Sequence, residues 1–98
     1  MARFVIQNKV YDTAKMKFIG NVKKWYELKD FVLQYLYGEC SRVYDCEMYR
    51  SDKGSYLITH HISGDVYGEA IDEGEAKNLL MRYDYENYAK LFGELEEA

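Results

Sequence analysis

The chain of 98 residues is long enough for one compact domain and too short for two. Its composition, 48% hydrophobic and 16% aromatic with no Pro, excludes an intrinsically disordered segment. No apolar run approaches the ~20 residues of a membrane-spanning helix, no secretory signal pattern is seen, and two cysteines are too few for a disulfide scaffold. We therefore expect a single domain over residues 1–98, in the cytoplasm and without a membrane partner.

The net charge of -4 is unevenly distributed along the sequence. Residues 1–37 contain seven Lys or Arg and three Asp or Glu, a balance of +4, whereas residues 38–98 contain six and fourteen, a balance of -8. One interpretation is that the charged residues of each half only keep the surface of that half in contact with water. The other is a dipolar molecule whose acidic side meets a basic partner, since charge asymmetry steers association. The overall negative charge disfavours direct binding of nucleic acid.

The first predicted elements are strands. Phe4–Gln7 and Val10–Tyr11 are apolar runs on either side of Asn8-Lys9. This pattern predicts a tight hairpin, because Asn adopts positive φ more readily than most residues. A turn at 12–15 then precedes a short apolar run from Met16 to Val22.

A helical period is predicted over residues 25–37. Apolar residues recur at helical spacing, charged residues lie off that stripe, and Gly38 stands where a helix would stop. Because the aromatic residues of the stripe also favour strands, the segment can instead be a strand or an interface. The stripe consists of Trp25, Leu28, Phe31, Val32, Tyr35 and Leu36.

The middle of the chain predicts an antiparallel sheet. Residues 42–50 and 56–62 alternate between the two sides of a strand, and the turn cluster at 51–54 separates them. A second turn at 63–65 leads to a further strand, Val66 to Ile71.

Two short helices are predicted at the end. Asp72 followed by Glu75 has the pattern of a capping box, and the apolar residues from Ala76 to Tyr83 share one helical face. Asp84 is a candidate cap for a second helix that stops at Gly93, and the tail 94–98 is expected to fray. The predicted fold is α+β: a small antiparallel β-sheet with an inserted amphipathic helix and two short C-terminal helices.

Catalytic and metal-binding residues are not predicted. His60 and His61 are adjacent in a strand, so their side chains point to opposite faces and do not readily share a metal with Cys40 and Cys46. Cys46 alternates with apolar neighbours and is interpreted as a small core residue rather than a nucleophile. We therefore expect neither enzymatic activity, nor a cofactor, nor a metal.

The eleven Tyr, several of them among acids near the end of the chain, favour a protein interface. Tyr brings large contact area, and the surrounding carboxylates favour a basic protein groove over nucleic acid. The simpler interpretation is that Tyr fills the core and edges of a small sheet. The predicted partner-binding residues are the acids Glu69, Asp72, Glu73, Glu75, Asp84 and Glu86, with Tyr83, Tyr85 and Tyr88 as anchors.

Four short motifs follow one another along the chain: KVYDT at 9–13, MYRSDKGSYL at 48–57, EAK at 75–77 and YAKLFG at 88–93. In this order they resemble a group of small acidic proteins encoded on phages and conjugative elements of Gram-positive bacteria. The match covers residues 4–20 and 44–93, while Trp25–Tyr37 and Thr59–His61 depart from the pattern. The resemblance implies a bacterial host cell and mobile cargo that includes anti-CRISPR inhibitors of type II nucleases; it implies no catalytic residue.

The leading hypothesis is a non-enzymatic inhibitor of a bacterial defence nuclease, a Cas9-type effector or a restriction enzyme. Its acidic, Tyr-rich face would occupy the basic channel that otherwise holds guide or target nucleic acid. The first alternative is a nucleic-acid-binding regulator of a mobile element that uses the basic N-terminal half. The second is a scaffold module that forms a homodimer through the stripe at 25–37. The basic residues of the first alternative are Arg3, Lys9, Lys15, Lys17, Lys23 and Lys24.

Overall fold

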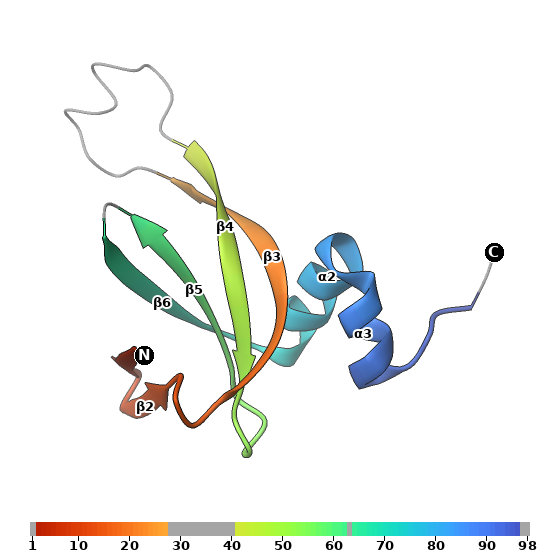
Figure 1. Ribbon diagram of the computed structural model, residues 1–98, viewed down its shortest axis with the longest axis horizontal. Coiled ribbons are helices and arrows are strands. Elements are labelled where there is room, and N and C mark those ends of the chain that lie inside the picture. The colour runs from red at the N-terminus through yellow and green to blue at the C-terminus, as the bar shows by residue number, and fades with distance from the viewer. Residues whose placement is uncertain (1, 28–40, 63, 97–98) are drawn as a thin grey trace.

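The computed structural model describes residues 2–27, 41–62 and 64–96. They form a two-stranded hairpin, a four-stranded antiparallel sheet and two helices, an α+β fold (Figure 1). No helix in this part of the chain combines the length and apolarity needed to cross a membrane. In chain order the elements are β1 (Arg3–Ile6), β2 (Lys9–Asp12), β3 (Lys17–Glu27), β4 (Ser41–Arg50), β5 (Tyr56–Ile62), β6 (Asp65–Ile71), α2 (Glu73–Tyr83) and α3 (Tyr85–Phe92).

The predicted first hairpin is confirmed, but its turn lies one residue earlier than expected. Gln7 and Asn8 both have positive φ, 50° and 64°, as the turn of a two-residue hairpin requires. This register pairs Phe4 with Tyr11. The Tyr11 side chain is buried and the Phe4 ring packs against Gly68 of β6. A shift by one residue would turn both rings toward solvent.

The four long strands pair in sequence order, β3-β4-β5-β6, and the strands predicted over 42–50, 56–62 and 66–71 are confirmed. β3 pairs along the whole of β4, whereas only residues Glu47–Arg50 of β4 also pair with β5. A bulge at Ile19 interrupts the β3–β4 register and buries that side chain in the core.

The helix predicted over residues 25–37 is wrong at its beginning. Trp25–Glu27 belong to β3 and pair with residues 41–43 of β4. The aromatic residues that fit a helical period fit a strand equally well, and pairing with a distant strand decides between the two. The rest of the predicted helix, residues 28–37, lies outside the described residues.

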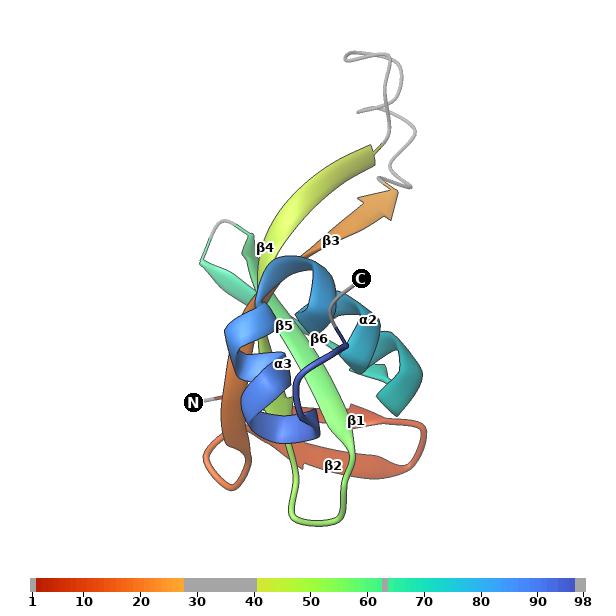
Figure 2. The ribbon, with the colours of Figure 1, turned by 90° about the vertical axis from the view of Figure 1, so that its right-hand side faces the viewer.

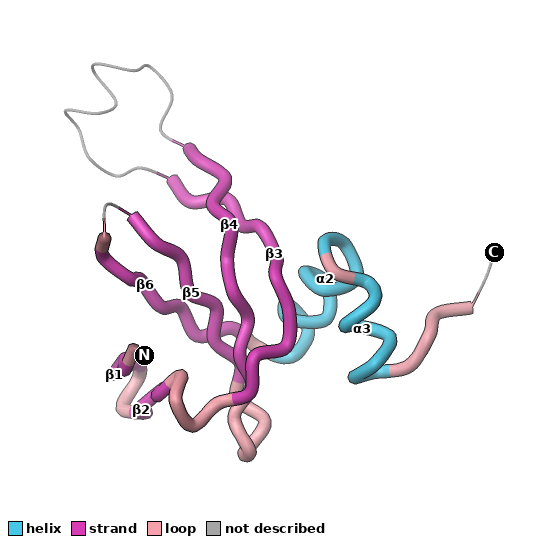
Figure 3. The backbone as a smooth tube through the Cα atoms, in the orientation of Figure 1, coloured by secondary structure: helices cyan, strands magenta, loops and turns pink. Residues whose placement is uncertain are grey.

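The two predicted C-terminal helices are confirmed, and they cover one face of the sheet (Figures 2 and 3). Ala76 and Leu80 of α2 and Tyr88 of α3 pack against alternate residues of the strands. The β1–β2 hairpin packs on the other face, where Leu57 and Thr59 of β5 are buried. The strand side of this core consists of Ile19, Val22, Cys46, Met48, Tyr56 and Ile58.

Candidate acidic interaction surface

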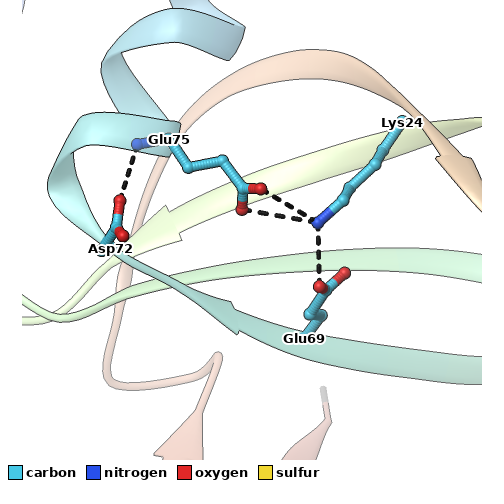
Figure 4. A network of polar contacts seen from close by, with 4 residues as sticks. All are labelled: Lys24, Glu69, Asp72 and Glu75. Atoms are coloured by element: carbon cyan, nitrogen blue, oxygen red, sulfur yellow. Dashed lines mark hydrogen bonds and ion pairs between the residues drawn. The ribbon is translucent and has the colours of Figure 1, made fainter.

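Two predicted partner-binding acids, Glu69 and Glu75, are bound by a lysine of β3 (Figure 4). Lys24 Nζ donates hydrogen bonds to Glu69 Oε1 at 2.8 Å and to Glu75 Oε1 at 3.3 Å. Partial burial alone would lower the pKa of Lys24, but the hydrogen bond and charge of Glu69, and then those of Glu75, outweigh burial and raise the pKa. Lys24 therefore stays protonated and offsets the charge of both acids within the molecule.

This contact also joins distant parts of the sheet. β3 and β6 are its two edge strands, and Lys24 of β3 reaches Glu69 of β6 on the face that α2 covers. The Lys24 ammonium group thus ties together both edges of the sheet and the first turn of α2.

Asp72 and Glu73 lie at the start of α2 and are exposed. Asp72 is the helix cap, because its Oδ1 accepts a hydrogen bond from the Glu75 backbone N–H at 2.7 Å. The Glu75 side chain is held by Lys24. Glu73 lies 4.0 Å from Lys77 one turn later, and such exposed pairs contribute little. The carboxylates of Asp72 and Glu73 are therefore accessible to a partner, and they also stabilise the positive end of the helix dipole.

Asp84 has a structural role that sequence reasoning assigned only in part. Its Oδ2 accepts hydrogen bonds from the Asn87 side-chain amide at 2.8 Å and from the Asn21 backbone N–H of β3 at 3.1 Å. Burial alone would raise the pKa of Asp84, but these hydrogen bonds from Asn87 and Asn21 outweigh it and lower the pKa. Asp84 fixes the corner between α2 and α3 against the sheet.

Tyr88 must be removed from the predicted anchors. Its side chain is only 8% exposed and belongs to the core, where its ring packs against Phe92 with a centroid distance of 5.3 Å. Tyr83 is half-buried beside the same core, and the guanidinium of Arg82 lies over its ring. For Tyr88, the simpler interpretation of Tyr as core filling is the correct one.

Tyr85 and Glu86 of α3 are exposed, and the chain after Gly93 folds back beside them. The Leu95 backbone N–H donates a hydrogen bond to the Tyr85 hydroxyl at 2.8 Å. The tail was expected to fray, but its described residues, 94–96, include this contact. A shallow groove results, lined by Tyr85, Glu86, Ala89, Lys90 and Glu94.

Glu94 is a candidate site residue that sequence reasoning missed. The available signal was Gly93, whose φ of 92° allows the chain to reverse direction. We call Asp72, Glu73, Tyr85, Glu86 and Glu94 the acidic helical surface. It holds four carboxylates and one Tyr, all exposed, on α2, on α3 and at their outer ends.

The histidines lie on opposite faces of the sheet, as predicted. His60 is buried between the rings of Tyr44 and Tyr67, with centroid distances of 5.1 and 5.5 Å. His61 is exposed and lies 3.8 Å from Glu47. Burial lowers the pKa of His60, so its ring is neutral at pH 7.

Cys46 is buried with 2% of its surface exposed, which confirms its interpretation as a core residue. Cys40 of the considered zinc set lies outside the described residues. Among the described residues, no three His, Cys, Asp or Glu side chains are grouped as metal ligands would be.

The predicted basic residues are only partly grouped: Arg3, Lys9 and Lys15 line one groove, whereas Lys23 and Lys24 lie elsewhere on β3. Lys24 is held by Glu69 and Glu75, Lys23 lies 3.9 Å from Asp45, and Arg3 lies 3.5 Å from Asp12. The predicted apolar stripe contributes one described exposed side chain, Trp25, which is 63% exposed beside its cross-strand neighbour Val43.

Comparisons of the chain with protein-family models, with curated proteins and with solved structures find no match.

Proposed function

We propose that this protein is a non-enzymatic inhibitor that binds the basic nucleic-acid channel of a bacterial defence nuclease of the Cas9 type. The observation that carries the proposal is the acidic helical surface, where carboxylates remain exposed on two packed helices and the adjoining tail. The resemblance of four sequence motifs to small acidic proteins of mobile elements suggests the setting. The other acids of the predicted site hold the fold together.

The inhibition is electrostatic and steric. Glu73 and Glu86 pair with the Lys and Arg side chains that otherwise bind phosphates, and Tyr85 adds a rigid aromatic contact. Because these charges are exposed, salt screens them over about 8 Å at physiological ionic strength. Association therefore slows as the salt concentration rises.

The test is a kinetic binding experiment with purified Cas9-type nucleases, free of guide RNA. Charge reversal in the double variant Glu73→Lys/Glu86→Lys should lower the association rate by about tenfold at low salt. Glu75 is unsuitable for this purpose, because its replacement also breaks the contact with Lys24.

The matched control is Asp52→Lys/Asp65→Lys, which changes the net charge equally at two exposed positions away from the helices, in the β4–β5 turn and at the start of β6. Its association rate at the same salt concentration should fall by less than about threefold, since the reversed charges lie away from the contact and act only through the longer-range field. Equal slowing by both double variants would show that net charge, rather than this surface, governs binding.

A further inference from the structure

A second surface lies on the opposite side of the sheet from the acidic helical surface. A groove runs between the β1–β2 hairpin and the turn that connects β4 to β5. Its walls come from β2 (Lys9–Asp12) and from residues 51–55, and residues 15–16 line it as well. The proposed inhibition uses none of these residues.

The groove is cationic in a molecule of net negative charge. Four basic residues line it against two acids, Asp12 and Asp52, and Asp12 is paired with Arg3. Among the described residues, no carboxylate lies within ion-pair distance of the other three cations. These are Lys9, Lys15 and Lys53, all exposed.

Apolar residues also line the groove. Tyr11 and Met16 line it, and Val10 is 66% exposed beside them. A nucleic-acid backbone gains nothing from such side chains, whereas the apolar residues of a peptide do. The combination therefore favours a peptide with both carboxylates and apolar side chains.

The backbone of β2 supports the same occupant. Ile6 and Lys9 close the two-residue turn, and the Thr13 N–H donates to Ala2 O at 2.9 Å at the other end of the hairpin. In the alternating antiparallel pattern, the N–H and C=O groups of Val10 then point away from β1. This open edge can hydrogen-bond an extended peptide.

We propose that this groove binds an extended acidic peptide segment of a partner protein. Its carboxylates pair with Lys9, Lys15 and Lys53, its apolar side chains contact Val10 and Met16, and its backbone joins the edge of β2. The protein would then have two binding poles of opposite charge, one on each side of the sheet.

The test measures fluorescence anisotropy of a short labelled peptide made of Glu-Ser-Glu-Leu repeats. The full chain should bind it, and the peptide with Gln in place of Glu should bind at least about tenfold more weakly. The double variant Lys9→Glu/Lys53→Glu should weaken binding by about tenfold, because each exposed ion pair contributes a factor of about 2–5 and reversal adds repulsion.

The matched control is Lys23→Glu/Lys90→Glu, which alters two exposed lysines outside the groove with the same change in net charge. Its affinity for the peptide should change by less than about threefold. Circular dichroism of both double variants shows whether they are folded. A Val10→Asp variant tests the apolar contacts of the peptide independently and should weaken binding as well.

Four results would overturn the proposal. The first is no binding of the Glu-containing peptide by the folded chain. The second is equal weakening by the groove variant and its control. The third is tighter binding of a labelled single-stranded oligonucleotide than of the peptide. The fourth is self-association of the chain through the groove in light scattering. None of these results depends on whether a nuclease binds the acidic helical surface.

Discussion

Replacement of Gly20 by Ala should destabilise the protein, because Leu80 and Asp84 lie close to the Gly20 Cα on β3. A Cβ atom at this position would lie 2.7 Å from Leu80 Cδ2 and 2.9 Å from Asp84 Oδ2. Leu80 is completely buried, so a shift of its methyl group disturbs the core, and displacement of Asp84 weakens its hydrogen bond to the Asn21 N–H. Overpacking of this kind costs about 1–3 kcal/mol. We expect the free energy of unfolding to fall by about 2 kcal/mol.

The assay is urea and thermal unfolding followed by circular dichroism. For a chain of this length, about 2 kcal/mol corresponds to a fall in Tm of about 10 °C. Gly74→Ala in α2 is the control, since the nearest atom to its Cβ, Asp72 Oδ1, is 3.4 Å away. Reduced freedom of the unfolded chain should make that variant about 0.5 kcal/mol more stable. If Gly20→Ala were as stable as the original chain, the close packing of the helices on β3 would be refuted.

Three further predictions concern the contacts that hold the acidic residues and the sheet. Lys24→Met should lower the free energy of unfolding by about 1–2 kcal/mol, and by less in the Glu75→Gln background. A double-mutant cycle by urea unfolding measures the coupling between the two residues, and additive losses of stability would contradict the Lys24–Glu75 contact. Burial lowers the folded-state pKa of His60 below the unfolded value, so protonation favours unfolding. The stability that neutral His60 contributes is present above pH 6.5 and is lost as the pH falls from there toward the lowered pKa; His60→Phe should flatten this dependence, and an unchanged slope would disprove it. Tyr85→Phe should increase hydrogen exchange of the Leu95 amide, which loses its acceptor, without measurable change in Tm; equal protection in both proteins would show that the tail is not held there.

Local signals in the sequence were sufficient for most of the fold. The hairpin turns, the alternation of β4 and β5, and the Asp72 cap each depend on residues a few positions apart, which a pattern can reveal. The alternation of apolar and polar residues that predicted Cys46 in the core is also such a local signal. The turn at Gln7-Asn8 was misplaced by one residue because its register depends on contacts of Phe4 with distant β6.

The candidate site was less predictable because its contacts are distant in sequence. Lys24 is 45 residues from Glu69 and 51 from Glu75, so no local pattern indicates that these acids are held. Tyr88 and Tyr85 stand in the same helix and equally acidic surroundings, yet packing buries one and exposes the other. Likewise Trp25 fits a helical period until its pairing with Val43 places it in a strand.

The most direct test of the proposed inhibition is target cleavage by a Cas9-type nuclease in the presence of increasing amounts of this protein. If the acidic helical surface occupies the basic channel, an equimolar amount added before the target DNA should abolish cleavage. The same amount added after the target is bound should have little effect, and Glu73→Lys/Glu86→Lys should restore cleavage. Complete cleavage by every type II nuclease assayed at excess inhibitor, or inhibition that survives both charge reversals, would contradict the account.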